Sequence, residues 1–236
     1  MTTLTTQSTL ADIVTARPSL ARVLEAHGLD YCCGGATTLQ DACDNLQLDA
    51  TAVLTDLTAN SSDETPPEWA TMNVAALVDH LEATHHRYLW AEMPRLSALA
   101  DKVRTVHGDR HPELADIAAC YGTLRADMEP HLAKEERVLF PMIRELSAAN
   151  TAPSFHCGSL NNPISVMLTE HDTVGELLAR LRELTNGYQP PADGCASYAT
   201  LFTGLAELEA DTHLHVHKEN NVLFPAVVAL EQQLAS

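Results

Sequence analysis

A sixteen-residue segment occurs twice in this chain, and the repeat restricts the fold more than any other feature. Residues 126–141 and 210–225 share nine identical positions at an offset of 84 residues. Both copies contain the frame Asp-x3-His-x3-Glu, which is Asp127, His131 and Glu135 in the first copy. On an α-helix, residues four apart lie on one face, so these side chains stack one turn apart. The sequence therefore predicts two similar helices that each present a histidine and a glutamate.

The hydrophobic periodicity predicts an all-α protein built around an up-down four-helix bundle. Helical spacing of apolar residues extends over four long segments, approximately 74–99, 112–146, 163–184 and 195–234. No strand pattern competes with them, and short breaks between them favour antiparallel neighbours. Short helical patterns surround a loop with paired glycines near the N-terminus, and a polar, proline-containing stretch follows them. We expect a small helical domain at 1–60 with the Cys32-Cys33 loop, a linker at 61–71 and the bundle at 72–236.

The charge of the chain excludes several classes of partner. Acidic residues outnumber Lys and Arg by 32 to 14, which gives a formal net charge of −18. A field of this sign repels nucleic-acid phosphates and anionic membranes. The N-terminus lacks the apolar segment of a targeting signal, and no run of about 18 apolar residues could span a bilayer. The six cysteines do not form a secreted disulfide framework. We expect a cytoplasmic protein with reduced thiols.

The histidine and glutamate of each repeat fall on the core-facing stripe of their helix. In the second long segment the stripe, at spacings of three and four, includes Met128, His131, Glu135, Val138 and Met142. In the fourth segment the corresponding stripe includes Thr212, His215, Glu219 and Val222. A buried carboxylate costs several kcal/mol unless its charge is offset. Because neither stripe contains a lysine or arginine, two inward-facing glutamates require a cation.

Two further histidines, His86 and His171, lie among apolar neighbours in the first and third long segments. In an antiparallel hairpin, residues equidistant from the turn lie at equal height. The midpoints between the histidines of consecutive helices fall near residues 108, 151 and 193, all within predicted breaks. Four histidines, one from each helix, should therefore meet on one level of the bundle. The similar offsets of the histidines also suggest two duplicated helical hairpins.

This set of ligands points to two metal ions. Four imidazoles and two carboxylates are too many ligands for one tetrahedral zinc. They suit two transition-metal ions, each with two histidines, bridged by Glu135 and Glu219, and imidazole with carboxylate favours iron over thiophilic metals. Asp127 and Asp211, one turn before the repeat histidines, are expected to accept hydrogen bonds from ring nitrogens. The predicted metal ligands are His86, His131, Glu135, His171, His215 and Glu219.

The remaining histidines and cysteines give weaker indications. Exposed or ligand-orienting positions are expected for His80, His85, His213 and His217. Solvated positions are expected for His27, His107, His111 and His156. Cys32 and Cys33 should be free thiols, because a bond between adjacent cysteines closes a strained ring. Glycine N–H groups can stabilise a nearby thiolate. The pair is therefore either a redox or soft-metal handle, or one packed cysteine beside one idle cysteine. The other four cysteines are expected to be packed or at the surface.

The chain resembles the RIC (repair of iron centres) family of di-iron proteins along nearly its whole length. The resemblance rests on the Asp-Tyr-Cys-Cys-Gly-Gly signature and hemerythrin-like motifs at 30–35, 131–136, 139–141, 163–167, 170–172 and 219–225. It implies a hemerythrin-like bundle that holds two non-haem irons, oxo- or hydroxo-bridged, on the six ligands predicted above. It also implies that Glu170 and Asp127 serve access or proton movement beside the irons. A cytoplasmic bacterial homodimer, induced by nitric oxide or peroxide, is expected.

The resulting expectation is a protein that repairs iron–sulfur clusters damaged by nitrosative or oxidative stress, by supplying iron. Its clients would be iron–sulfur proteins, and its small ligands nitric oxide or O2, with no nucleic-acid or membrane partner. The functional residues expected beside the ligands are Cys32, Cys33, Glu170 and Asp127. Two alternatives remain open: reduction of nitric oxide to nitrous oxide at the paired irons, which could bring two molecules together, or reversible binding of O2 or nitric oxide as a carrier or sensor.

Overall fold

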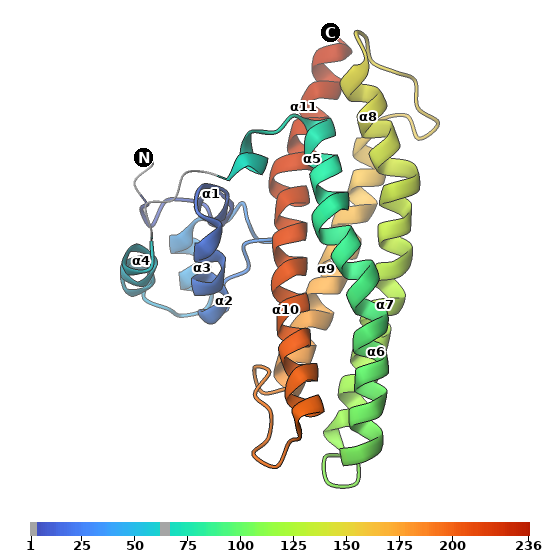
Figure 1. The fold of residues 1–236 in the computed structure, drawn as a ribbon. Coiled ribbons are helices and arrows are strands. Elements are labelled where there is room, and N and C mark those ends of the chain that lie inside the picture. The colour runs from blue at the N-terminus through green and yellow to red at the C-terminus, as the bar shows by residue number, and fades with distance from the viewer. Residues whose placement is uncertain (1–3, 62–66) are drawn as a thin grey trace.

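The computed structural model describes residues 4–61 and 67–236 and contains a small N-terminal helical domain beside a long helical bundle (Figure 1). Most of the predicted linker, residues 62–66, lies outside the described residues. Within the described ranges the secondary structure is helical apart from two isolated β-bridges, at Thr9 with Thr38 and Phe155 with Gly158. The predicted fold class, a four-helix bundle preceded by a small helical domain, is confirmed.

The small domain consists of short helices with side-chain caps. Its elements are α1 (Leu10–Ala16), η1 (Pro18–Leu20), α2 (Ala21–Ala26), α3 (Leu39–Asn45) and α4 (Ala50–Ala59). Thr9, Thr38 and Asp49 each accept a backbone N–H in the first turn of α1, α3 and α4, which satisfies groups that a short helix leaves unpaired. Leu10, Leu24 and other apolar residues form a core that also includes Val216 of the bundle.

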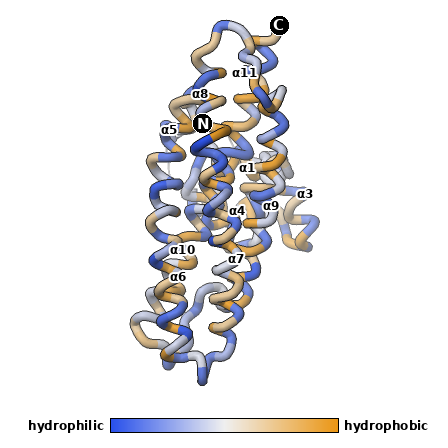
Figure 2. Tube along the Cα trace, turned by 90° about the vertical axis from the view of Figure 1, so that its right-hand side faces the viewer, coloured by the Kyte–Doolittle hydropathy of each residue, from blue (hydrophilic) through white to orange (hydrophobic). Residues whose placement is uncertain are grey.

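The bundle consists of four rods that run alternately up and down (Figure 1). Rod 1 joins α5 (Val74–Leu81), η3 (Glu82–His86) and α6 (Arg87–His107), after the short 3-10 turn η2 (Glu68–Thr71). Rod 2 joins α7 (Glu113–Lys134), η4 (Glu135–Leu139) and α8 (Phe140–Ala148). Rod 3 is α9 (Asn161–Leu184). Rod 4 joins α10 (Ala196–Lys218), η5 (Glu219–Leu223) and α11 (Phe224–Leu234). Hydrophobic and polar residues alternate along the rods, as expected for helices with one buried face (Figure 2).

Rod 1 is longer than predicted. The sequence pattern suggested an end near residue 99, whereas α6 continues to His107. The buried residues Ala100, Val103 and His107 extend the inward stripe at helical spacing beyond Leu96. Burial of this last turn also corrects the expectation that His107 is solvated.

Three π-helical turns, η3, η4 and η5, interrupt rods 1, 2 and 4. A π turn accommodates one extra residue and so rotates everything after it relative to an α-helix. This rotation corrects one sequence prediction. Val138 was assigned to the inward stripe but is 41% exposed, while Leu139 is 2% exposed. Pro141 follows η4, where it cannot donate the usual helical hydrogen bond, and this local cause fits the irregular turn.

Candidate metal centre

Six side chains from all four rods meet in the interior of the bundle. His86 ends η3, Glu135 begins η4 and Glu219 begins η5, so the π turns place three of the six. The others, His131, His171 and His215, lie within α7, α9 and α10. All six are at most 1% exposed. The structure therefore brings together every residue that the sequence predicted as a metal ligand.

The six residues form two overlapping groups. One contains His86, Glu135, His215 and Glu219, and the other contains His131, Glu135, His171 and Glu219. Within each group the donor atoms lie within 4.8 Å of one another. Both glutamates belong to both groups, and each group takes one histidine from rods 1 and 2 and the other from rods 3 and 4. The arrangement suits two cations that share two carboxylates.

The histidine rings face one another in a way that a cation explains. Nε2 of His86 lies 3.2 Å from Nε2 of His215, and Nε2 of His131 lies 3.1 Å from Nε2 of His171. Nδ1 of His86 donates to Glu136 at 3.0 Å, and Nδ1 of His131 donates to Glu170 at 2.8 Å. With the proton on Nδ1, Nε2 carries a lone pair. Lone pairs therefore converge, as they do around a metal.

The carboxylates give a second, independent indication. Both oxygens of Glu135 lack a hydrogen-bonding partner within residues 4–61 and 67–236, although the side chain is fully buried. Burial and the neighbouring Glu219 raise the pKa of Glu135 well above its usual range. Burial also opposes ionisation of Glu219, but His215 and His171 outweigh it and lower the pKa of Glu219. Without a cation the two glutamates cannot both be charged, whereas bound cations would satisfy both. The donor set therefore fits a metal pair.

Burial keeps the histidines in the form that binds metals. It lowers the pKa of His131 to about 4 and that of His215 to about 3. Both rings are therefore neutral at pH 7, and a neutral imidazole can offer its lone pair to a metal.

Two residues that orient the ligands were missed from the sequence. Glu136 accepts from Nδ1 of His86, and Asn220 accepts from Nδ1 of His171 at 2.7 Å. Each directly follows a shared glutamate, and the two occupy equivalent positions of the repeat. This equivalence in the repeat could have identified both residues from the sequence. The fourth ring, His215, has no partner for Nδ1 in the described part of the chain.

The expected orienting contacts of the two aspartates are wrong. Asp127 is exposed, and the acceptor for His131 is Glu170, which also binds Lys134. Asp211 accepts from Nδ1 of His85 at 2.8 Å rather than from His215. An aspartate four residues before a histidine on a regular helix is too short to reach the far side of that ring, whereas a neighbouring rod supplies a longer acceptor.

Two histidines expected at exposed or orienting positions, His85 and His217, are deeply buried. His85 stacks on His215, with ring centroids 5.3 Å apart, and its Nε2 accepts from Lys218 at 2.7 Å. Burial lowers the pKa of Lys218 to about 8. His217 lies at the boundary with the small domain, where its Nε2 is 3.1 Å from the hydroxyl of Thr15.

The cysteine loop lies against rods 3 and 4, and both thiols are free, with Cys32 buried and Cys33 half-buried. The N–H groups of Cys32, Cys33 and Gly34 all donate to the carboxylate of Asp30, at 2.9 to 3.0 Å. A thiolate stabilised by glycine N–H groups was one possibility that the sequence left open. Instead, the hydrogen bond to Cys33 and burial raise the pKa of Cys32. Both effects favour the neutral thiol of Cys32 over a thiolate.

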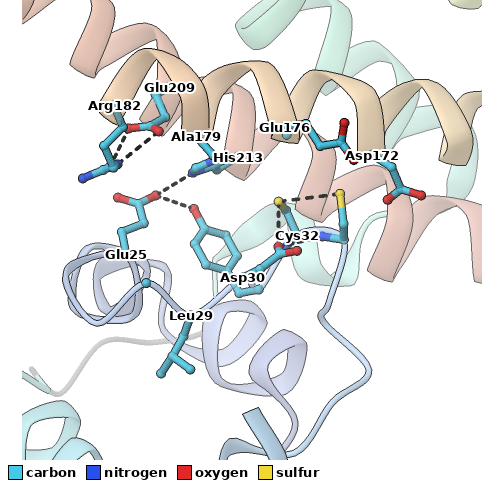
Figure 3. A pocket seen from close by; sticks show the side chains of 14 residues that line it. Glu25, Leu29, Asp30, Cys32, Asp172, Glu176, Ala179, Arg182, Glu209 and His213 are labelled. Carbon is cyan, nitrogen blue, oxygen red and sulfur yellow. Dashed lines mark hydrogen bonds and ion pairs between the residues drawn. The ribbon is translucent and has the colours of Figure 1, made fainter. Parts of the chain in front are cut away.

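A cavity of about 570 Å³ opens between this loop and the helices α9 and α10 (Figure 3). Cys32 and Cys33 line one side, and Asp172 and Glu176 line the other. The donor atoms of Asp30, Cys32 and Cys33 also lie within 4.8 Å of one another. A cavity with thiols and carboxylates on facing walls is suited to a cation rather than to an anion.

Known proteins match both parts of the chain. Residues 77–227 match the family model described as the hemerythrin HHE cation binding domain, and residues 6–61 match a domain of unknown function, DUF542. The probable iron-sulfur cluster repair protein of Haemophilus influenzae is 33% identical over 225 residues, which cover 94% of this chain and 97% of the relative. The iron-sulfur cluster repair protein YtfE of Enterobacter sp. is 32% identical over 222 residues, with the same coverage. Among the described residues, none of the helices has the length and apolar character needed to cross a membrane.

Proposed function

Because the chain belongs to the family of iron-sulfur cluster repair proteins that carry a hemerythrin HHE cation-binding domain, we propose that it repairs iron–sulfur clusters by supplying iron. The clusters would be those damaged by nitrosative or oxidative stress. The observation that carries the proposal is the pair of buried groups that share Glu135 and Glu219. Two cations that share both carboxylates can be held tightly as a pair, and one can leave when a shared carboxylate shifts.

The resident metals in this proposal are two non-haem irons, with an oxo or hydroxo group as a further bridge. His86 and His215 would hold one iron, His131 and His171 would hold the other, and the two glutamates would bridge them. The bound irons supply Lewis acidity and one-electron chemistry. The chain itself buries the ligands, keeps the rings of His131 and His215 neutral, and holds three of the four rings by hydrogen bonds at Nδ1.

As cargo, an iron ion leaving the His131 group would find carboxylates on two sides of α9, and a thiol on one of them. Glu170 is partly exposed, and its hydrogen bonds to Lys134 and His131 overcome partial burial and lower its pKa. The ionised carboxylate is therefore suited to attract a cation that leaves the His131 group, whereas no contact among the described residues supports such a role for Asp127. On another side of α9, the cavity beside the cysteine loop has Asp172 and Cys33 in its lining, and Glu170 is not one of its lining residues. The half-buried Cys33 is better placed than Cys32 to hand iron to a client.

The proposal is tested by measuring metal content and iron transfer separately. Protein purified without added metal should contain iron, and Mössbauer spectra should report a coupled pair. Mixed with an iron–sulfur hydro-lyase whose cluster has lost iron but kept its sulfide, it should restore activity to that enzyme. Cys33→Ser should keep its iron and lose most of the transfer. Cys195→Ser, which changes an exposed cysteine outside the cavity, is the matched control.

Two results would contradict the proposal. Iron-free protein after purification would remove the cargo, and undiminished transfer by Cys33→Ser would remove the relay. Homodimer formation, a cytoplasmic location and nitric oxide as a ligand stay predictions, which size-exclusion chromatography, fractionation and nitric oxide titration would test. No observation favours nitric oxide reduction or O2 carriage over repair.

A further inference from the structure

Asn220 and Glu136 occupy equivalent places in the two halves of the bundle. They are 84 residues apart, which is the offset of the repeat, and each is the second residue of a π turn. Each accepts a hydrogen bond from Nδ1 of a histidine on the preceding rod: His86 for Glu136 and His171 for Asn220. The position therefore has one shared task, which is to hold a ligand ring by its outer nitrogen.

The two residues differ in what their remaining atoms can do. A carboxylate only accepts hydrogen bonds, whereas an amide accepts through its oxygen and donates through its nitrogen. Glu136 uses its carboxylate to accept also from Trp90, at 2.8 Å. Nδ2 of Asn220 instead donates to the carbonyl oxygen of Cys32 at 3.3 Å and lies 4.0 Å from Sγ of Cys33. One amide therefore contacts a candidate metal ligand and the cysteine loop at once.

The carbonyl oxygen of Cys32 determines which group donates and which accepts in the hydrogen bonds from Cys32 through Asn220 to His171. A carbonyl oxygen is only an acceptor, so the atom of Asn220 that faces it must be the NH2 group. The amide oxygen then faces Nδ1 of His171, which must carry the proton. Nε2 of His171 consequently keeps the lone pair that points at the shared carboxylates and at His131. The backbone of the cysteine loop thus selects the metal-binding tautomer of a ring on another domain.

A second asparagine, Asn221, also fixes the Cys32-Cys33 loop to the bundle, so a change in the loop can reach Asn220. Asn221, the next residue, donates to the carbonyl oxygens of Cys32 at 2.9 Å and Tyr31 at 3.3 Å. Gly35 lies so close that an added Cβ would sit 2.4 Å from the side-chain oxygen of Asn221. Among the hydrogen bonds of the described residues, Asn221 makes none to His171, and its Nδ2 lies 3.3 Å from Nδ1 of His217. The neighbouring residue therefore docks the same loop without touching the metal site.

We infer that Asn220 is a positioning residue that couples the state of the Cys32-Cys33 loop to the metal site of His131 and His171. A change at the thiols that shifts the Cys32 carbonyl or crowds Cys33 alters the hydrogen bond to His171, and with it the donor strength of Nε2. By thermodynamic linkage, metal binding at His171 changes the conformational equilibrium of the loop by the same free energy with which the loop changes metal binding. The inference rests on the proposed metal centre but not on iron transfer.

The test uses the iron-loaded full chain and needs no client. Alkylation of Cys33 with iodoacetamide, located by peptide mass spectrometry, should shift the Mössbauer doublet of one iron and leave the other unchanged. Asn220→Asp keeps an acceptor for His171 but cannot donate to Cys32, so alkylation should no longer shift either doublet. Asn221→Ala is the matched control, and it should keep the shift because its amide does not contact His171.

A second measurement reads the same coupling from the thiol. Cys33 should be alkylated at different rates in iron-loaded and chelator-treated wild-type protein, and at one rate in both forms of Asn220→Ala. Release of one iron to a chelator should become about tenfold faster in Asn220→Ala, the lower end of the effect known for residues that orient ligands. Circular dichroism verifies that each variant is folded.

The inference is overturned if alkylation shifts the doublet equally in Asn220→Asp and wild type, or if Asn221→Ala abolishes the shift. Loss of iron transfer with the spectral coupling intact would contradict the proposed function and leave this inference standing. Wild-type protein that transfers iron but shows no doublet shift on alkylation would overturn this inference and leave the proposed function standing.

Discussion

Replacing Gly35 by alanine should undock the cysteine loop from the bundle. An added Cβ would lie 2.4 Å from the side-chain oxygen of Asn221 and 2.7 Å from the carbonyl oxygen of Tyr31. Both distances are well inside van der Waals contact, and one of the two neighbours is backbone. The conflict is relieved only if Asn221 or the loop moves.

The size of the effect follows from the hydrogen bonds that this movement breaks. Asn221 donates to Cys32 and Tyr31, and a typical hydrogen bond contributes about 0.5–1.5 kcal/mol net. Losing both would weaken docking by roughly 1–3 kcal/mol. Since each 1.4 kcal/mol is a factor of about ten, the docked population should fall relative to the undocked one by roughly 5- to 150-fold.

The assay is the rate of Cys33 alkylation, followed by mass spectrometry of the peptide that contains it. The rate should rise in Gly35→Ala because the half-buried thiol becomes accessible. Gly122→Ala is the control: Gly122 is exposed on α7 with no atom within 4 Å of an added Cβ, so this change should stabilise the helix by roughly 0.5–1 kcal/mol and leave Cys33 unaffected. Alkylation of Gly35→Ala at the wild-type rate would refute the reasoning.

Three further outcomes are expected. Chelating the metals should lower the unfolding temperature in differential scanning fluorimetry, and Glu135→Gln, which removes one buried charge, should reduce that drop; an equal drop in both proteins would contradict the role of Glu135. Glu170→Gln should weaken metal binding in competition with a chelator by about 10- to 100-fold, because His131 loses a charged acceptor; unchanged affinity would show that this contact is incidental. Backbone N–H groups and His107 lower the pKa of Cys195 to about 7, so its alkylation rate should rise with pH around a midpoint near 7, because the thiolate is the reactive form. His107→Ala should move this midpoint to higher pH. An unchanged midpoint would show that His107 does not lower the pKa of Cys195.

The sequence predicted the rods and the convergence of the ligands because both depend on regular helical spacing. Heptad-like recurrence identifies the inward face, and the equal distances of four histidines from three breaks place them at one height. The small domain and the Cys32-Cys33 loop were recognised from short motifs and turn residues.

The errors arise where that regularity ends. A π turn adds a residue, so a stripe extrapolated at α-helical spacing reaches Val138 when the buried residue is Leu139. Asn220 lies in a different π turn, η5, and donates to the carbonyl oxygen of Cys32, a contact that periodicity does not predict. Contacts between domains have no repeat in sequence, so the docking of Cys32 on Asn220 and Asn221 could not be anticipated.

The pairing of the rings has a mechanical consequence. Neither duplicated hairpin owns a complete binding pocket, because His86 partners His215 and His131 partners His171 across the two halves. Each bound ion would therefore act as a cross-link between the hairpins, and the shared acids would reinforce it. Loss of the ions would remove these cross-links, so the two hairpins should separate more readily in the metal-free protein than in the metal-bound one.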